Sequence, residues 1–272
     1  MSPFRFSLNA STIRTTPLLD KIRVTAEAGY EGIELWFDEV EQYLAEGGKL
    51  ETISQALKDG GLAVPTMIML RDWWSATEEE YPRVFQTCLD RIKLASQLGA
   101  EYVIACPHRD KNPDYDLGAK RYRELLEAGI EAGAKPAVEF LGFVADVTTI
   151  EDALRIVEKS GHPAATLVLD PFHVFRGGGS METIAQLKPE QIAISHFNDA
   201  VDTLPRETQM DPDRVLPGDG HLDLVHYCRL LKQIGYEGWL SLELFREDLW
   251  QQDPLQVAQV GLERMQIVAE HA

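Results

Sequence analysis

The sequence predicts an α/β fold, a single (β/α)8 TIM barrel that spans residues 1–272. Short apolar segments of β type alternate with helical segments along the whole chain, and 272 residues is the length of one large barrel. No predicted strand runs into a glycine-rich GxGxxG phosphate loop, which argues against the alternative of an open doubly wound sheet. No long internal repeat or low-complexity linker interrupts the alternation, so we expect one domain.

Each predicted strand is a short run of apolar or β-branched residues, and a helical pattern follows it. We expect the strands at 4–9, 31–37, 63–70, 101–107, 136–142, 165–171, 191–197 and 239–245. We expect the helices at 17–28, 40–58, 78–98, 115–134, 149–159, 181–187, 222–234 and 254–270. The glycines in "AGYEG" and "QLGAEY" mark helix ends, because glycine is common just past a helix C-terminus.

The composition is that of a globular protein, with 44% hydrophobic and 26% charged residues. No apolar run approaches the roughly 20 residues that cross a bilayer. The first residues lack a signal-peptide pattern, so we expect a cytoplasmic protein with no membrane partner. The formal net charge of −18 argues against a nucleic-acid partner, because phosphate binding depends on Lys and Arg. The three cysteines form no CxxC pattern, so neither a disulfide framework nor a cysteine metal cage is expected.

Four ionisable residues stand at the ends of the last four predicted strands. They are Glu139 in "AVE", Asp170 in "LVLD", His196 in "AISH" and Glu243 in "LSLE". In a parallel barrel the carboxyl ends of the strands form the active-site face, so barrel closure directs these side chains at one point. Three unpaired carboxylates beside one imidazole are costly to bury, and a divalent cation removes that conflict. We therefore expect these four residues to hold one divalent metal ion: Mn²⁺, Mg²⁺, Co²⁺ or Zn²⁺.

Each of these residues has a simpler explanation when it is taken alone, since an acidic residue at a strand end is often a helix N-cap or a surface carboxylate. Their recurrence at four equivalent positions favours the metal site. His173, three residues after Asp170, is either a core histidine or a substrate hydrogen-bond donor, and its place beside a candidate ligand favours the donor. Arg214 forms either a surface salt bridge or a contact with substrate oxygens. Its place in a turn-rich loop, just before "LPGDG", favours the substrate contact.

The first half of the chain supplies candidate pocket residues at its strand ends. Glu34 and Trp36 end the second strand, and we expect Glu34 to accept a hydrogen bond from a substrate hydroxyl. Trp73 and Trp74 follow the third strand, and His108 follows the fourth. Aromatic faces pack against the C–H faces of sugars, which suits a small polyol or keto-sugar substrate, although the paired tryptophans can equally pack beneath a loop. The predicted strand ends carry no lysine for a Schiff base and no phosphate loop, so an unphosphorylated substrate is favoured.

Six motifs spread over nearly the whole chain carry a family resemblance. They are "GYEGIELW", "KPAVEFLG", "TLVLDPFHVFRGG", "ISHFNDA", "DRVLPGDGHLDL" and "GYEGWLSLELFR". Together they resemble the xylose isomerase-like TIM barrels of the sugar phosphate isomerase/epimerase superfamily, and within it the inosose (2-keto-myo-inositol) isomerases. That family holds its metal with Glu, Asp, His and Glu at the ends of strands five to eight. The resemblance therefore implies the same four ligands in this sequence, Glu139, Asp170, His196 and Glu243. The resemblance further implies that His173 and Arg214 contact substrate oxygens and that Asp199 supports His196 or the metal.

These expectations combine into a metal-dependent isomerase or epimerase that transfers a proton through a metal-stabilised enediolate. Glu139 and Glu243 are the expected acid–base residues. The alternative is a dehydratase of the inosose or 3-dehydroshikimate type, which expels a hydroxyl after the same proton abstraction. A DNA-repair endonuclease of the same superfamily needs a basic face that this acidic chain lacks. A barrel that binds without turnover is disfavoured by the retention of both glutamates. The resemblance also implies that a homo-oligomer can form.

Overall fold

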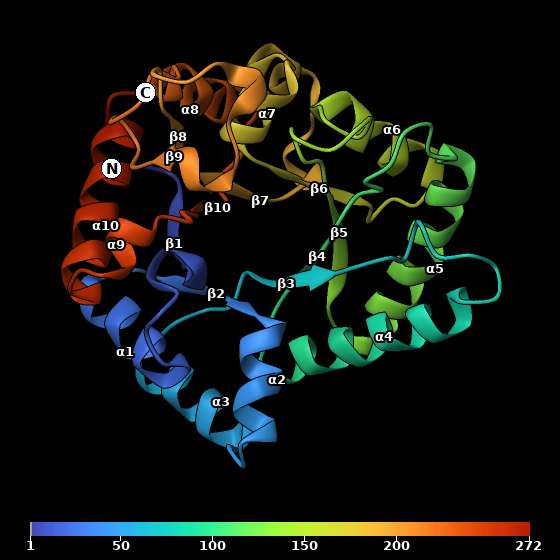
Figure 1. Ribbon diagram of the computed structural model, residues 1–272, viewed down its shortest axis with the longest axis horizontal. Helices are drawn as coiled ribbons and strands as arrows, with labels where there is room; N and C mark the ends of the chain where they lie inside the picture. Colours follow the sequence, from blue (N-terminus) through green and yellow to red (C-terminus); the bar gives the residue numbers. More distant parts are fainter. Residues whose placement is uncertain (1) are drawn as a thin grey trace.

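The computed structural model describes residues 2–272 and contains a closed barrel of parallel strands with helices around it (Figure 1). The barrel strands are β1 (Arg5–Asn9), β2 (Gly32–Trp36), β3 (Thr66–Leu70), β4 (Tyr102–Ala105), β5 (Lys135–Glu139), β6 (Thr166–Leu169), β7 (Ile192–Phe197) and β10 (Trp239–Leu242). Each strand pairs with its neighbours in chain order, and β1 closes the barrel against β10. The predicted (β/α)8 barrel is confirmed, and every predicted strand overlaps an observed one.

The helices lie outside the ring of strands (Figure 1). They are α1 (Leu18–Ala28), α2 (Phe37–Ala45), α3 (Leu50–Asp59), α4 (Tyr81–Gln97), α5 (Tyr115–Ala132), α6 (Ile150–Ser160), α7 (Pro171–Gly177), α8 (Leu224–Gln233), α9 (Glu247–Trp250) and α10 (Pro254–Glu270). The single helix expected at 40–58 is wrong. Gly47 adopts a φ of 92°, which ends α2 in the left-handed region and allows α3 to start in a new direction. The segment expected as a helix at 181–187 is a 3-10 helix, Met181–Gln186.

The segment after β6 also differs from the expectation. The sequence predicts a strand end followed by a loop, but residues 171–177 form α7. Asp170 caps this helix by accepting a hydrogen bond from the backbone N–H of His173 (3.2 Å), and Pro171 occupies the first helical position. An acidic N-cap followed by proline is a recognised helix start, so the signal for α7 was present in the sequence.

A second unexpected element lies between β7 and α8. The two-residue strands β8 (Asp199–Ala200) and β9 (Arg214–Val215) pair antiparallel, with Ala200 opposite Arg214. This pairing fixes the backbone of the long connection between β7 and α8. It places Arg214 in a buried position, where the residue is only 1% exposed. The candidate site residue Arg214 is therefore held in place by backbone pairing.

The core has two parts. The larger part packs between the strands and the helices, and a smaller cluster contains Ile68, Ile104, Ala137, Val168, Ala193, Ile194 and Trp239. Apolar strand residues thus fill most of the barrel, as in other barrels of this kind. The buried polar residues include the candidate ligands at the carboxyl ends of the strands and, within the strands, Glu34, Thr66 and Ser241. Within residues 2–272 we find no helix with the length and apolar character needed to traverse a bilayer.

Candidate metal centre and active site

The four candidate ligands lie at the carboxyl ends of four neighbouring strands. Glu139 is the last residue of β5, Asp170 directly follows β6, His196 lies near the end of β7, and Glu243 directly follows β10. These strands are consecutive around the barrel, in the order β5, β6, β7 and β10. All four side chains are buried, with at most 6% of each residue exposed. The fold therefore gathers the residues that the sequence analysis selected.

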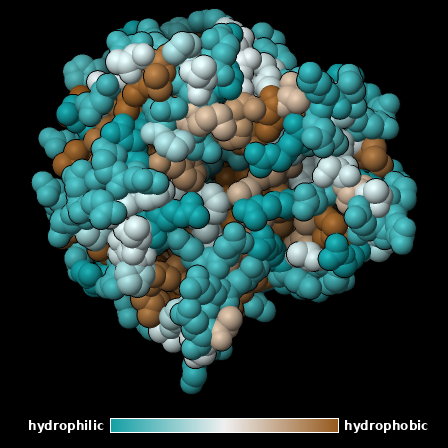
Figure 2. Space-filling view, in the orientation of Figure 1, coloured by the Kyte–Doolittle hydropathy of each residue, from teal (hydrophilic) through white to brown (hydrophobic). Residues whose placement is uncertain are grey.

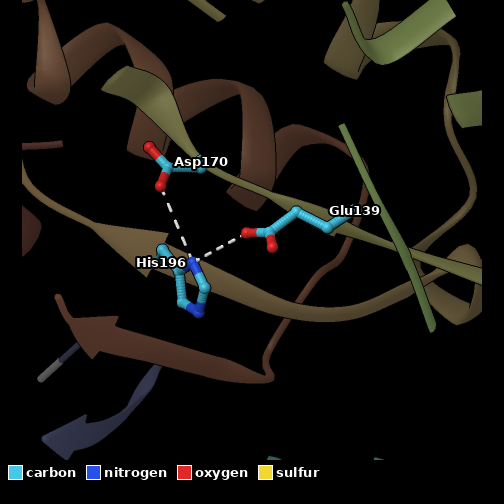
Figure 3. Close-up of side chains that lie close together, drawn as sticks. All are labelled: Glu139, Asp170 and His196. Carbon is cyan, nitrogen blue, oxygen red and sulfur yellow. Dashed lines mark ion pairs between the residues drawn. The ribbon is translucent and has the colours of Figure 1, made fainter. Parts of the chain in front are cut away.

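The centre of the group is the imidazole of His196 (Figure 3). Its Nδ1 atom lies 3.2 Å from Glu139 Oε1 and 3.6 Å from Asp170 Oδ2. One donor atom from each of these three residues lies within 4.8 Å of the others. Glu243 Oε2 also lies 3.2 Å from the same nitrogen, although its carboxylate is shared with other partners. Three residues form the compact group, and Glu243 adjoins it.

The chemistry of this donor set fits a divalent cation. His196 Nδ1 is buried and makes no hydrogen bond with any described residue, although three carboxylates lie near it. A buried nitrogen without a hydrogen-bond partner is unfavourable, and an imidazole lone pair beside carboxylate oxygens is an ordinary metal donor set. Glu139, Asp170 and His196 would hold the ion, with Glu243 as a fourth ligand.

Arg214 lies on β9, in the connection between β7 and α8, and its side chain contacts the candidate ligands. Its guanidinium donates a hydrogen bond to Glu243 and lies 3.1 Å from Asp170 Oδ2 and 3.0 Å from Asp211 Oδ1. Nη2 of Arg214 also lies 2.9 Å from His173 Nε2. The surface salt bridge considered for Arg214 is therefore wrong, since the side chain is buried among the candidate ligands.

His173 lies on α7 beside the same group. Its Nδ1 lies 3.2 Å from the backbone nitrogen of Gly142, and its ring packs edge-on against Phe143. Burial lowers the pKa of His173 to about 3, and the Arg214 charge adds to that effect, so the ring is neutral near pH 7. An arginine side chain can only donate, so both ring nitrogens face an N–H group, that of Gly142 at Nδ1 and that of Arg214 at Nε2, and a neutral ring accepts from one of the two.

The environment separates the carboxylates into two kinds. Burial alone would raise the pKa of Asp170, but Arg214, His173 and His196 together outweigh it and hold that pKa far below the usual range, with Arg214 the largest of the three effects. Burial raises the pKa of Glu139, and it raises the pKa of Glu243 to about 8. Asp170 therefore stays ionised, whereas burial shifts both glutamates toward the protonated form, and Glu243 can take up a proton near neutral pH.

Burial alone would lower the pKa of His196. The surrounding carboxylates, Glu243 and Glu34 above all, outweigh burial and raise that pKa well above its usual value. This negative environment is the one that a cation would relieve.

Glu34 and Asp199 do not take the positions expected of them. Glu34 was expected on the pocket wall, but it is fully buried beneath the site, and its Oε2 lies 3.4 Å from His196 Nε2. Asp199 was expected to support His196 or the metal. Its carboxylate instead accepts hydrogen bonds from the backbone N–H groups of Gly218, Gly220 and Leu222, which shape the loop before α8. Glu34 thus contacts the histidine, and Asp199 anchors a loop.

Asn9, at the end of β1, was missed by the sequence analysis. Its side-chain amide donates to Glu34 Oε1 (3.3 Å) and to Glu243 Oε1 (3.0 Å). Its oxygen accepts from the indole N–H of Trp36 (2.9 Å) and from the backbone N–H of Ser11 (3.0 Å). The one signal for Asn9 in the sequence was a polar residue at the end of an apolar strand. Its partners Glu34 and Glu243 come near it through barrel closure.

A cavity of about 180 Å³ lies against the candidate ligands. Figure 2 shows hydrophobic side chains in the hollow near the centre of an otherwise largely hydrophilic face. Polar groups of Glu139, Glu243, His173 and Arg214 line it. The other lining residues are Trp36, Ile68, Met69, Cys106, Arg109, Leu141, Phe143, Met210, Asp211 and Phe245. A neighbouring cavity of about 380 Å³ shares Met69, Cys106 and Arg109 with the first.

The aromatic residues of the first half divide between wall and core. Trp36 lines the smaller cavity and packs edge-on against Phe245. Trp74 lines the larger cavity, while Trp73 is fully buried and donates to the carbonyl of Cys106. His108 packs edge-on against Trp74 and, in the described chain, lines neither cavity. Its expected substrate contact has no support in this geometry.

The chain is similar in sequence and in fold to known proteins. The chain is 30% identical over 254 residues to the inosose isomerase of Bacillus licheniformis, which covers 89% of this chain and 88% of that protein. It is 25% identical over 236 residues to the 3-dehydroshikimate dehydratase of Pseudomonas putida, where the match covers 85% of this chain and 36% of that longer protein. A crystal structure of the IolI protein with a zinc atom bound has a TM-score of 0.92 and 25% identity, with 98% of each chain covered.

A family model supports the same assignment over most of the chain, since it matches residues 22–267. The closed barrel of parallel strands agrees with the architecture that this family model describes. The chain belongs to the xylose isomerase-like TIM barrel family.

Proposed function

We propose that this protein is a divalent-metal-dependent isomerase or epimerase that acts on an inosose or a similar unphosphorylated keto-sugar. The observation that carries the proposal is the group formed by Glu139, Asp170 and His196, whose donor atoms lie together around a buried nitrogen without a hydrogen-bond partner. The inosose isomerase relatives and the zinc atom in the structurally similar IolI protein support the same reaction class and cofactor.

The two glutamates are the acid–base pair of this proposal. One glutamate removes the proton from the carbon that bears a hydroxyl next to the substrate carbonyl, and the released electron pair forms a carbon–carbon double bond. The carbonyl oxygen takes the negative charge, which gives an enediolate. Protonation of the former carbonyl carbon and loss of the hydroxyl proton then move the carbonyl to the neighbouring carbon. A divalent cation bound at the site would supply Lewis-acid polarisation of the carbonyl. The raised pKa values of Glu139 and Glu243 suit both proton transfers.

The remaining residues of the smaller cavity orient the substrate. Arg214 lines the cavity beside the His173 ring, and its guanidinium would donate hydrogen bonds to hydroxyl or carbonyl oxygens. Trp36, Phe143 and Phe245 supply aromatic surface for the C–H face of a sugar ring. The cavity of about 180 Å³ is smaller than the roughly 300–1,000 Å³ of pockets that hold drug-sized ligands, which suits a small substrate.

A dehydratase is the second candidate, and Arg109 favours it. This exposed arginine lines both cavities and forms no ion pair with the residues of the described chain. An unpaired guanidinium at the pocket wall suits a substrate carboxylate, such as that of 3-dehydroshikimate, better than it suits a neutral inosose. The 3-dehydroshikimate dehydratase relatives support this alternative.

One experiment tests both candidates. Protein stripped of metal by a chelator is reloaded separately with Mn²⁺, Mg²⁺, Co²⁺ or Zn²⁺ and incubated with inososes, ketoses and 3-dehydroshikimate. Isomerisation gives a ketone product of unchanged mass, whereas dehydration gives a product lighter by one water and with conjugated or aromatic absorbance. Turnover of an inosose to an isomer is the expected result. Absence of turnover with every metal and substrate class would contradict the proposed function.

A further inference from the structure

Glu34 is a buried carboxylate inside the barrel that the proposed chemistry does not use. It lies on β2 and is fully buried. Oε1 accepts hydrogen bonds from the Ser241 hydroxyl and from Asn9, while Oε2 accepts one from the Thr66 hydroxyl and lies 3.4 Å from His196 Nε2. Four partners on four other strands therefore surround this one side chain.

A carboxylate at this place requires an explanation, because barrel interiors are normally filled by apolar side chains. Burying a charge is unfavourable unless the group is paired and hydrogen-bonded, and an apolar residue would pack the same space without that cost. Glu34 does not line the cavity, so it does not meet the substrate. Its contact with His196 is its link to the candidate ligands.

That contact determines how His196 presents itself to the site. An ionised carboxylate can only accept hydrogen bonds, so Nε2 of His196 carries the hydrogen that faces Glu34. In the neutral ring, Nδ1 then has the free lone pair, and Nδ1 is the atom that faces Glu139, Asp170 and Glu243. Carboxylates that bind the second nitrogen of a ligand histidine fix its tautomer and its ring orientation in many metal sites.

Asn9 completes the arrangement from the neighbouring strand. Its oxygen accepts from Trp36 and Ser11, which sets the orientation of the amide, so the nitrogen must face Glu34 and Glu243. The backbone register places Asn9 directly opposite Glu34. One amide group thus joins the carboxylate behind His196 to the carboxylate of Glu243.

We propose that Asn9 and Glu34 are positioning residues that orient His196 and Glu243 for metal binding from the first two strands of the barrel. This inference rests on the proposed function for the identity of the ligands. It adds that residues of β1 and β2 orient two of the ligands, His196 on β7 and Glu243 at the end of β10. The ligands themselves come from the second half of the chain, while the residues that hold them come from the first.

The test measures metal affinity rather than turnover. Full-length wild-type protein and the variants Glu34→Gln and Asn9→Ala are stripped with a chelator and titrated with Zn²⁺, or with Mn²⁺, in a calorimeter. Glu34→Gln preserves size but removes the charge that holds Nε2–H, so its Kd for the metal should rise about 10- to 100-fold. Asn9→Ala removes the donor to Glu243, and its Kd should rise about 10-fold.

A matched control comes from Tyr122, a buried hydrogen-bonding residue behind β5 and β6. Its hydroxyl accepts from the backbone N–H of Thr166, and its single hydrogen lies within reach of the carbonyls of Pro136 (3.1 Å) and Thr166 (3.0 Å), at the ends of these strands opposite Glu139 and Asp170. Tyr122→Phe should lower the melting temperature without changing the metal Kd. The visible absorption of Co²⁺-loaded protein is a second readout, because it follows ligand geometry. It should change in Glu34→Gln but not in Tyr122→Phe.

Each outcome separates the positioning role from a purely structural one. If both Glu34→Gln and Asn9→Ala fold and bind metal as tightly as wild type, the positioning role is wrong and the proposed function stands. If Glu34→Gln does not fold, an unchanged Kd in Asn9→Ala overturns the inference and a raised one supports it. If the wild-type protein binds no divalent metal, both proposals fail. If it binds metal but turns over none of the substrates, only the proposed function fails.

Discussion

Glu139 and Glu243 each place one carboxylate oxygen 3.2 Å from the same atom, Nδ1 of His196. Burial raises the pKa of both carboxyl groups, to about 8 for Glu243. Asp170, in the same group, is kept ionised by Arg214 together with His173 and His196. Neighbouring titratable groups whose pKa values are pushed apart are typical of acid–base sites, and this separation distinguishes the two glutamates from the aspartate.

The first prediction concerns Glu243. Glu243→Gln should lower kcat by about 10²- to 10⁴-fold, since an amide cannot accept the substrate proton. The fold should persist, because glutamine has nearly the same volume and Arg214 keeps its contacts with Asp170 and Asp211. Steady-state kinetics on the best inosose substrate, with circular dichroism for the fold, checks this expectation. Glu131→Gln, on the exposed surface of α5, is the control. Undiminished kcat in Glu243→Gln would exclude an acid–base role.

The second prediction concerns metal removal. Chelation should abolish turnover and lower the melting temperature, and a divalent ion should restore both. An ion at 100 times its Kd stabilises the folded state by about 2.7 kcal/mol, which corresponds to a shift of roughly 5–10 °C for a chain of this size. Differential scanning fluorimetry before and after reloading measures the shift, with KCl at matched ionic strength as the control. A chelated protein with full activity and an unchanged melting temperature would rule out a metal site.

The third prediction separates the two candidate reactions. Arg109→Ala should raise KM for a substrate that bears a carboxylate by roughly 10-fold or more, because a charge-assisted hydrogen bond is lost. KM for a neutral inosose should change little. Arg71→Ala is a matched control, since Arg71 lines only the larger cavity and lies 3.5 Å from Asp38. If Arg109→Ala raises KM for the carboxylate substrate no more than it raises KM for the inosose, or no more than Arg71→Ala does, Arg109 does not select for the carboxylate.

The candidate ligands were predictable because their signal is local. Glu139, Asp170, His196 and Glu243 each follow apolar strand residues, and the rule that strand ends face the active site needs no knowledge of contacts. The start of α7 was equally local, since Asp170 is followed by proline, but an apolar run masked it.

The roles of Asn9 and Glu34 could not be predicted in this way. Asn9 meets Glu243 across 234 positions of sequence, through the pairing of β1 with β10 that closes the barrel. Glu34 points at His196 because of the register around the ring, and sequence alone does not give that register. For Asp199 the family resemblance implied a contact with His196 or the metal. A motif does not reveal that its carboxylate instead accepts hydrogen bonds from backbone N–H groups of the loop before α8.

The fourth prediction concerns the start of α6. Thr149 and Asp152 form a capping box, in which the Thr149 hydroxyl accepts from the backbone N–H of Asp152 and the Asp152 carboxylate accepts from that of Thr149. Thr149→Ala should lower the free energy of unfolding by about 0.5–2 kcal/mol. Thr149→Ser keeps the hydroxyl and should lose less. Urea unfolding followed by circular dichroism gives both values, and equal losses in the two variants would show that the hydroxyl is not the cap.

The last prediction concerns the thiols. Cys88, Cys106 and Cys228 are all buried, and burial raises the pKa of Cys88 and of Cys228 to about 12. The thiolate is the reactive form, and at pH 8 a group with that pKa is ionised in only about 1 molecule in 10⁴. Burial raises the pKa of Cys106 as well, although this residue lines the cavity and is 8% exposed.

Native protein should therefore react slowly with Ellman's reagent at pH 8, with Cys106 as the fastest site, and the rate should rise with pH as the thiolate fraction grows. In guanidinium all three thiols should react at once. Rapid modification of Cys88 or Cys228 in the native protein, located by mass spectrometry, would show that the helices covering them open more readily than their packing indicates.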